Sequence, residues 1–293
     1  EPVLSGWGMR FQPIVKPLIC KPVADALLEA KSKGASRIAI SLDLGRSSEE
    51  VILDSRGVIH ESFELGWDSI ELAARRERDI YMVEGSELIP LAISSDRFYK
   101  LVLVRWGHPP TLEIDGIHMH RILDVTPEVD SELKVRLLGD LRCRRVLDIC
   151  TGLGYTAIAA LRRGACSITT IEKDENVISL ARLNPWSREL ADERVELRIG
   201  DAFTILDEYD EEFDAIIHDP PRISLAGELY GLEFYHKLAK ALKPGGRLVH
   251  YVGQPGIHRG RRIWRGVIER LRLAGFEARY DENSRCVYGY KKR

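Results

Sequence analysis

Cysteine is scarce in this chain of 293 residues, and the five that occur lie far apart. None of them forms a C-x-x-C pair, so the sequence predicts neither a zinc site nor a disulfide framework. Long apolar runs are also missing, since a stretch such as residues 214–217 is far shorter than the roughly 20 residues of a membrane-spanning helix. We therefore expect no membrane segment, no signal peptide and a cytoplasmic location that keeps the cysteines reduced.

An excess of charge of either sign is absent as well. The 43 Lys and Arg residues nearly balance the 45 Asp and Glu residues, for a formal net charge of -2. Any nucleic-acid partner must therefore be sought in local patches rather than in the charge of the whole protein. Hydrophobic residues make up 44% of the chain, which is enough for a buried core, and the length favours two domains.

The first part of the chain, from Met9 onward, mixes short helical and strand patterns. Helices are expected at 23–33, which ends at Gly34, and at 68–80. Alternating or β-branched segments predict strands at 37–43, 50–53, 58–65, 101–106 and 111–121. We expect a smaller N-terminal α+β domain over residues 9–118, with a role in substrate recognition.

From residue 130 onward, strand and helix patterns alternate. Strands are expected at 144–149, 168–172, 194–198, 213–218, 246–252 and within 276–290. Helical patterns lie between them at 155–164, 174–183, 228–243 and 260–274. This alternation predicts an α/β domain with a doubly wound, mostly parallel sheet over residues 119–293.

The first of these strands leads into a glycine-containing turn and an alanine-rich helix, in the run VLDICTGLGYTAIAALRRG at 146–164. Gly152 and Gly154 allow a ligand to approach the backbone, and the amides at the start of the helix point toward it. Asp148 ends the strand, where its carboxylate can accept from a ligand ammonium. An ordinary tight turn has the same pattern, so the turn alone does not decide the function.

Acidic residues also follow the next two strands. Glu172 lies about as far beyond the turn as the acidic residue that binds both ribose hydroxyls of a nucleoside, although a solvated strand end is the alternative. Asp201, in the run GDAF, is placed to accept from an adenine amine, with Phe203 packing on the ring.

The fourth strand ends in His218-Asp219-Pro220-Pro221-Arg222. The prolines hold the backbone extended and leave carbonyls with fewer competing donors. Asp219 and the Pro220 carbonyl can together receive both hydrogens of a planar amino group. His218 is expected to be structural rather than a general base. Arg222 either meets a phosphate or a base, or forms a surface ion pair with Glu228 or Glu233.

These four strand ends, in this order and spacing, resemble the Rossmann-like class I methyltransferases that depend on S-adenosylmethionine. The resemblance spans residues 119–293 and implies S-adenosylmethionine as the co-substrate. It also implies that the co-substrate contacts come from Asp148, Cys150, Thr151, Gly152, Gly154, Tyr155, Glu172, Lys173, Asp201, Ala202 and Phe203. Most members of the class have glycine where this chain has Cys150.

The run Asp219-Pro220-Pro221 resembles the [DN]-P-P-[YFW] signature of methyltransferases that act on exocyclic base amines or a glutamine amide. The resemblance implies a catalytic role for these three residues and for Arg222, which replaces the usual stacking aromatic. With the segments HDPPRISLAGELY and TLEIDGIHMHR, the chain looks like a group of archaeal methyltransferases that includes ribosomal RNA cytosine amino-methyltransferases.

Basic residues gather in HRGRRIWRGVIERLR at 258–272, where Glu269 is the single acid. Such a helix can hold phosphates and stack bases on Trp264, and its apolar side also fits packing on the sheet. We expect structured RNA, in ribosomal RNA or the small ribosomal subunit, as the partner. The residues expected to contact it are Arg222, Ser224, Arg259, Arg261, Arg262 and Arg265.

Other functions remain open on the sequence. One is an aminopropyl transferase that acts on a polyamine with decarboxylated S-adenosylmethionine, although such an enzyme would call for more acids and fewer arginines. Methyl transfer to a protein amide or a DNA base, and a non-catalytic RNA-binding role, are further alternatives. No metal is expected, because His108, His118 and His120 lack further ligands at suitable spacing. The oligomeric state is not predicted.

Overall fold

The computed structural model describes residues 8–253 and 263–293, and the chain divides into two compact units. Unit 1 contains residues up to Gln12, then Glu128–Ile178 and Glu189–Arg293, and unit 2 contains Pro13–Pro127 and Ser179–Arg188. This division differs from the expected boundary between residues 118 and 119. The second unit extends to Pro127, where a helix of unit 1 begins, and it takes in a short segment from the middle of the other domain.

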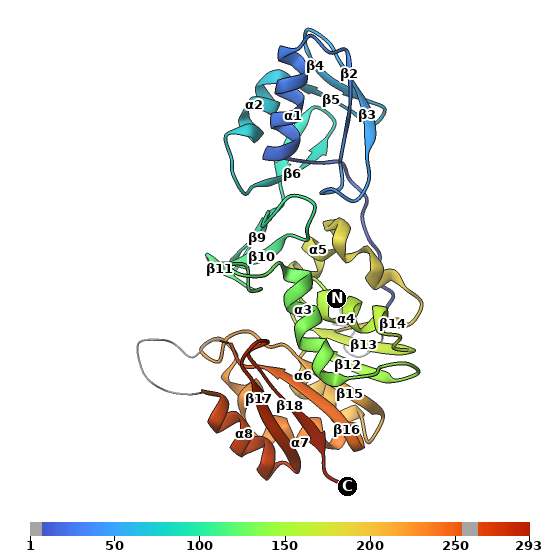
Figure 1. The fold of residues 1–293 in the computed structure, drawn as a ribbon, viewed down its shortest axis with the longest axis vertical. Helices are drawn as coiled ribbons and strands as arrows, with labels where there is room; N and C mark the ends of the chain where they lie inside the picture. Colours follow the sequence, from blue (N-terminus) through green and yellow to red (C-terminus); the bar gives the residue numbers. More distant parts are fainter. Residues whose placement is uncertain (1–7, 254–262) are drawn as a thin grey trace. The chain divides into compact units, whose positions relative to one another are not determined.

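Unit 1 is built on one seven-stranded sheet with the strand order β14-β13-β12-β15-β16-β18-β17 (Figure 1). Strands β14 to β16 in this order are parallel, whereas β18 runs antiparallel to both β16 and β17. The strands are β12 (Arg145–Ile149), β13 (Ser167–Glu172), β14 (Val195–Ile199), β15 (Phe213–His218), β16 (Leu242–Tyr251), β17 (Phe276–Asp281) and β18 (Cys286–Lys291).

Helices cover both faces of this sheet, because its parallel strands are apolar on both sides. On one face, Leu147, Ile216 and Leu248 pack in a single core with helices α6, α7 and α8. The helices of the unit are α3 (Pro127–Val135), α4 (Tyr155–Arg162), α6 (Ala202–Ile205), α7 (Leu232–Ala241) and α8 (Ile263–Leu273), and α5 (Glu175–Leu183) begins in unit 1 and ends in unit 2. Short 3-10 turns lie at Arg136–Leu138, Pro185–Ala191, Leu206–Glu208 and Gly227–Tyr230.

The order of the strands reverses at β12, which pairs with β13 on one side and with β15 on the other. The chain builds outward from β12 in one direction, then returns and builds outward through β15 in the other. In open α/β sheets, ligands bind outside the carboxyl ends of the strands at such a reversal. The topology therefore directs attention to the residues that follow Ile149 and His218, where the amide of Asp219 donates to the carbonyl of Ile149.

Unit 2 contains three small antiparallel sheets, with the orders β1-β6-β7, β2-β3-β4-β5 and β11-β10-β9-β8. Helices α1 (Lys21–Ser32) and α2 (Trp67–Ala74) pack against each other. The strands are β1 (Leu18–Cys20), β2 (Arg37–Ile40), β3 (Glu49–Leu53), β4 (Gly57–His60), β5 (Phe63–Gly66), β6 (Ile80–Glu84), β7 (Glu87–Pro90), β8 (Ala92–Ser94), β9 (Phe98–Val102), β10 (Thr111–Ile114) and β11 (Ile117–His118).

The predicted fold class is confirmed, both for the doubly wound, mostly parallel sheet and for the smaller α+β region before it. Details in unit 2 differ from expectation. The strand expected at 58–65 is a hairpin, and the helix expected to reach residue 80 ends at Ala74. Within the described residues, no helix is long and apolar enough to cross a membrane.

Candidate active site

A buried polar network shapes the turn after β12. The Asp148 side chain is fully buried, and its two oxygens accept from the hydroxyls of Thr156 on α4 and Thr170 on β13, at 2.8 and 2.7 Å. Burial raises the pKa of Asp148 to about 7, against the effect of these hydrogen bonds. Thr151 extends the network through its hydroxyl to Thr170. Asp148 therefore ties the turn to two neighbouring elements, and its expected contact with a ligand ammonium stays a prediction.

The turn itself has three residues with positive φ, namely Cys150 at 70°, Gly152 at 55° and Gly154 at 81°. Cys150 thus occupies a left-handed position that favours glycine. An added Cβ at Gly154 would lie 2.3 Å from the Leu190 side chain, whereas one at Gly152 would meet no atom within 4 Å. Gly154 therefore serves packing, and Gly152 faces open space.

Glu172, at the end of β13, is held toward this turn by backbone amides. Its carboxylate accepts from the amide of Gly152 at 2.9 Å and from the amides of Lys173 and Asp174 at 2.9 and 3.0 Å. Burial raises the pKa of Glu172, and these amides oppose the rise. The carboxylate is thus fixed beside the open space at Gly152, and its contact with a ribose stays a prediction.

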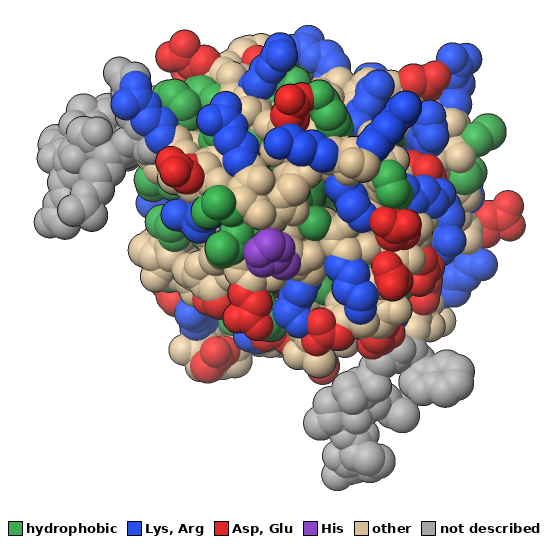
Figure 2. Space-filling view, turned by 90° about the horizontal axis from the view of Figure 1, so that it is seen from below, with side chains coloured by type: hydrophobic (Ala, Val, Ile, Leu, Met, Phe, Trp, Pro, Cys, Tyr) green, Lys and Arg blue, Asp and Glu red, His purple; other side chains and the backbone are tan. Residues whose placement is uncertain are grey.

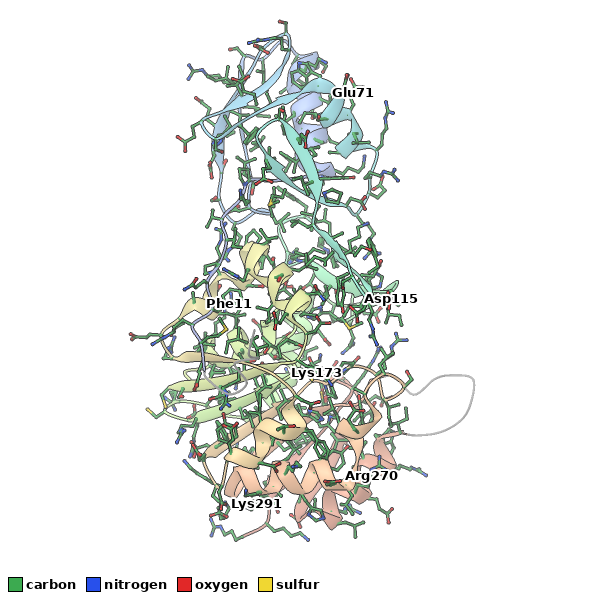
Figure 3. All side chains as sticks on the ribbon, turned by 180° about the vertical axis from the view of Figure 1, so that it is seen from behind. Phe11, Glu71, Asp115, Lys173, Arg270 and Lys291 are labelled. Atoms are coloured by element: carbon green, nitrogen blue, oxygen red, sulfur yellow. The ribbon has the colours of Figure 1, made fainter. Side chains whose placement is uncertain are left out.

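Asp201 begins helix α6, where its side chain accepts from the amide of Phe203 at 2.9 Å. The other carboxylate oxygen lies 2.9 Å from the ammonium of Lys173, which is labelled in Figure 3. Burial raises the pKa of Asp201, but Lys173 and the Phe203 amide together hold it below its ordinary value. The Phe203 ring packs against Phe234, with 5.9 Å between ring centroids, so it belongs partly to the core.

Asp219, the acid after β15, pairs with a lysine that the sequence analysis did not identify. The Lys134 ammonium lies 2.8 Å from Asp219 and 2.9 Å from Asp130, and only 1% of its side chain is exposed. It also lies 4.0 Å from the centre of the Tyr251 ring. Burial raises the pKa of Asp219, and Lys134 opposes this rise. For Lys134 itself, burial opposes the charge, but the two carboxylates outweigh it and raise the pKa.

Lys134 was not predicted from the sequence, because the pattern of residues 127–135 was not recognised as a helix. The segment nevertheless carried a signal, because Thr126-Pro127 is a typical helix start and Asp130 and Lys134 are spaced as an i,i+4 pair. Nothing in that spacing indicates burial, and exposed pairs of this kind are common. Only the fold shows that this pair extends to Asp219.

His218 is structural, as expected. Its side chain is fully buried, its Nε2 hydrogen-bonds the carbonyl of Leu229 at 3.0 Å, and burial lowers its pKa to about 4. His250 lies beside it, and the Tyr235 hydroxyl bonds its Nε2 at 3.0 Å. Nearby, the Tyr230 hydroxyl donates to the carbonyl of Pro221 at 2.9 Å and so fixes the loop after Asp219.

Arg222 and Ser224 are exposed beyond this loop. Arg222 forms no ion pair with any described residue, so of its two alternatives the ion pair with Glu228 or Glu233 is not found, and the contact with a phosphate or a base stays a prediction. Further along, Arg265 is exposed, but Trp264 stacks on Tyr280 with 5.0 Å between ring centroids and is less available to a base than expected. The predicted contacts Arg259, Arg261 and Arg262 lie outside the described residues.

These residues fit a co-substrate of the S-adenosylmethionine type. Gly152 leaves open space at the turn, Glu172 is held beside it, and Asp201 follows the next strand at the same edge of the sheet. We assign these three residues as those that would hold the nucleoside part. No group of histidine, cysteine or acidic side chains suited to a metal ion occurs among the residues that the structure describes.

Sequence comparison relates the chain to known transferases. Residues 141–275 match the spermine/spermidine synthase domain. Polyamine aminopropyltransferase 2 of Hyperthermus butylicus is 32% identical over 156 residues, which are 51% of each chain. The ribosomal RNA large subunit methyltransferase I of Yersinia pseudotuberculosis is 26% identical over 199 residues, which are 63% of this chain and 47% of the relative. These two relatives are matched over only about half of their lengths.

Structural comparison supports the same fold. Two crystal structures of spermidine synthase, one from Thermotoga maritima and one in complex with the transition state analogue AdoDATO, match 68% of this chain. The match covers 71% and 72% of those chains, with TM-scores of 0.52 and 0.53 and 21% sequence identity. At this identity the likeness establishes the fold alone.

A third relative covers nearly the whole chain. Uncharacterized protein MJ1233 of Methanocaldococcus jannaschii is 43% identical over 264 residues, which are 88% of this chain and 89% of the relative. With the fold and the strand-end residues described above, the chain therefore belongs to the family of MJ1233, within the superfamily of S-adenosylmethionine-dependent transferases.

Proposed function

We propose that the protein transfers a methyl group from S-adenosylmethionine to the exocyclic amine of a base in structured RNA, most simply cytosine in ribosomal RNA. One observation carries this proposal, namely which oxygens of Asp219 and Pro220 have no hydrogen-bond donor among the described residues. Lys134 binds one oxygen of Asp219, Oδ2, at 2.8 Å. Among the described residues, no donor reaches Oδ1 of Asp219 or the carbonyl of Pro220. Two adjacent acceptors thus remain for the two hydrogens of a planar amino group.

The roles of the residues follow from this arrangement. S-adenosylmethionine supplies an electrophilic methyl group on a sulfonium sulfur. Asp219 and the Pro220 carbonyl orient the amine so that its nitrogen lone pair points at that methyl. Tyr230 and Lys134 keep these acceptors in place, through Pro221 and Asp219 respectively. As the N–C bond forms and the S–C bond breaks, the nitrogen loses one proton, which passes through Asp219 to solvent.

A neutral amine fits the site better than a cationic one. A polyamine nitrogen is protonated near neutral pH and must lose a proton before it can attack. His218 cannot serve as that base, because it is fully buried and its pKa is lowered to about 4. Lys134 is neutralised by Asp130 and Asp219, so the cation near the acceptor site that is not neutralised is the exposed Arg222, three residues after Asp219. Arg222 forms no ion pair with the described residues and disfavours a second cation beside it.

Aminopropyl transfer to a polyamine is the second candidate. It is supported by the match to the spermine/spermidine synthase domain and by the Hyperthermus butylicus relative, which is named as a polyamine aminopropyltransferase. The Yersinia pseudotuberculosis relative, named as a ribosomal RNA methyltransferase, supports methyl transfer to RNA. Both reactions use the same fold and the same kind of co-substrate, so they differ at the acceptor.

The two reactions can be separated in one experiment. The protein is incubated with methyl-labelled S-adenosylmethionine and ribosomal RNA or small ribosomal subunits, and in parallel with decarboxylated S-adenosylmethionine and a diamine. We expect label in a methylated cytidine after nuclease digestion, and its loss in Asp219→Asn. The control Asp210→Asn changes an exposed acid and should leave transfer intact. A new polyamine without labelled RNA would establish the second candidate, and neither product would contradict both.

A further inference from the structure

Unit 1 contains a cavity of about 660 Å³ that is not part of the active site. It lies along β16, β18 and the edge strand β17, next to the end of α8. Four of its lining residues are basic and two are aromatic. We call it the basic groove and define it by Arg247, Arg272, Arg279, Lys292, Tyr288 and Tyr290.

The strand register brings four of these side chains, those of Arg247, Arg279, Tyr288 and Tyr290, onto one face of the sheet. Tyr290 on β18 lies between Arg247 on β16 and Glu277 on β17. Tyr288 lies next to Arg279 on β17, two residues further along each strand. Because side chains on a strand alternate between faces, the residues at these positions all point to the same side. Cations and tyrosines therefore alternate across a short width of exposed sheet.

The four basic side chains of the basic groove are not neutralised by ion pairs with described residues. Arg272, Arg279, Lys292 and Arg247 form no ion pair with the described residues, and Glu277 is the single acid that lines the cavity. Arg247 makes one contact, from its guanidinium to the carbonyl of Leu138 at 2.7 Å. The adjacent Lys291, by contrast, pairs with Glu211 at 2.9 Å. Four unneutralised cations around one cavity are complementary to a polyanion.

Tyr290 adds a second feature, because 47% of its surface is exposed. An exposed tyrosine beside Arg247 offers a flat surface on which a base can stack while the cations of the groove bind the flanking phosphates. Figure 2 views the end of this unit that carries the C-terminus, and Lys and Arg side chains gather along one side of that view.

We propose that the basic groove binds the backbone of the RNA substrate, with Tyr290 as the stacking residue for an unpaired base. The choice of RNA rests on the proposed function. The groove and the transfer site are connected by β16, on which Arg247 and Tyr251 are four residues apart. At about 3.3 Å per residue this is roughly 13 Å, a span of a few nucleotides. RNA held in the groove thus reaches the carboxyl edge of the sheet.

The test measures binding of a fluorescein-labelled unstructured RNA, and separately of small-subunit ribosomal RNA, at several salt concentrations. In the double variant Arg279→Gln/Lys292→Gln we expect weaker binding. We also expect the slope of the logarithm of the binding constant against the logarithm of the salt concentration to become shallower, by roughly 0.7 for each phosphate contact that is lost. The matched control Arg142→Gln/Arg145→Gln removes the same charge from exposed arginines that are already paired with Asp140 and Glu212. It should bind RNA nearly as the unaltered protein does.

Stacking is tested separately at Tyr290. We expect Tyr290→Ser to weaken binding roughly fivefold or more, and Tyr290→Phe to retain it. The proposal for the basic groove would be overturned if the double variant bound RNA as tightly as the unaltered protein, or if the control lost as much affinity as the double variant. Either result would leave the proposed function intact. Absence of RNA binding by the unaltered protein would overturn both. Binding of S-adenosylmethionine, measured by calorimetry, should be the same in all of these variants.

Discussion

Lys134 differs from most lysines in an i,i+4 pair, because its charge and that of Asp130 are both buried. We predict that Lys134→Met lowers the free energy of unfolding by about 3 to 5 kcal/mol, since it removes the buried cation that Asp130 and Asp219 share. Denaturant unfolding, followed by tryptophan fluorescence, measures this loss. Lys33→Met is the matched control, because Lys33 pairs with Glu29 at the same spacing on the surface. Its loss should be about 0.5 kcal/mol or less.

The role of Lys134 can also be tested by substituting one of the carboxylates that it pairs with. Adding Asp130→Asn to Lys134→Met removes one of the two uncompensated charges, so it should restore part of the lost stability. Equal losses for Lys134→Met and Lys33→Met would contradict the burial of this charge. A normal rate of transfer in a folded Lys134→Met protein would show that Asp219 does not need the lysine for its position.

The buried histidine predicts a pH dependence of stability. His218 titrates near 6.5 in the unfolded chain but only near pH 4 in the native protein, because burial disfavours its charge. The contribution of the neutral His218 to the free energy of unfolding is therefore complete above about pH 6.5, and it is lost as the pH falls toward 4. We predict that the stability difference between the unaltered protein and His218→Gln shrinks by about 1.4 kcal/mol per pH unit over this window.

Comparison with His218→Gln is necessary because buried carboxyls act in the opposite direction. The pKa of Asp148 is raised to about 7, so its contribution falls as the pH rises. Unfolding midpoints measured from pH 7 to 4.5 give the difference directly. His236→Gln, on the exposed side of α7, controls for the substitution itself. A difference that stays constant with pH would contradict the assignment of His218 as a neutral, buried group.

At the scale of elements, the two glycines of the turn after β12 should respond differently to alanine. Gly154→Ala places a methyl group against Leu190 at a φ of 81°, so we expect a loss of stability of about 1 to 2 kcal/mol or more. Gly152→Ala meets no neighbour, so its main effect should be weaker binding of S-adenosylmethionine.

Thermal unfolding and calorimetric titration of both variants measure the two effects. Addition of Leu190→Ala should relieve part of the cost at Gly154 and none of the cost at Gly152. If Gly152→Ala binds the co-substrate normally, then the open space at this glycine is not where the co-substrate approaches the turn.

The elements that sequence patterns predicted well are those of the parallel sheet. Strands β12 and β15 are short, mostly apolar runs, with Asp148 near the end of the first and Asp219 directly after the second. This signal is strong because both faces of the sheet are buried. Short antiparallel strands such as β6, β7 and β8 gave a weaker signal and were not predicted. Their positions depend on pairings between distant segments, as when β1 pairs with β6.

The candidate site likewise contains residues that the sequence could predict and residues that it could not. Glu172, Asp201 and Asp219 follow strands, so their positions could be derived from the sequence. Lys134 reaches the site from a helix that precedes the sheet, and its role depends on a tertiary contact. The sequence also could not predict that the Asp148 side chain points into the interior, where it accepts from Thr156 and Thr170. An acid at the end of a strand can face either a ligand or the interior.

At the scale of the whole molecule, co-substrate binding should stabilise the folded protein. A ligand that binds only the native state adds about 2.7 kcal/mol at a hundred times its dissociation constant. We predict that saturating S-adenosylmethionine raises the thermal midpoint of the unaltered protein and leaves that of Glu172→Ala unchanged. Glu193→Ala, an exposed acid of the same unit, should retain the shift. A shift retained by Glu172→Ala would contradict the ribose-binding role of Glu172.

Unit 1 is assembled from segments that are far apart in the chain, and one of them precedes unit 2 entirely. Met9 exchanges two backbone hydrogen bonds with Leu197 on β14, at 2.8 and 3.0 Å, and so pairs with the edge of the seven-stranded sheet. During synthesis on the ribosome, Met9 emerges long before its partner. The segment must therefore wait, unpaired, until all of unit 2 and the first three parallel strands have been made.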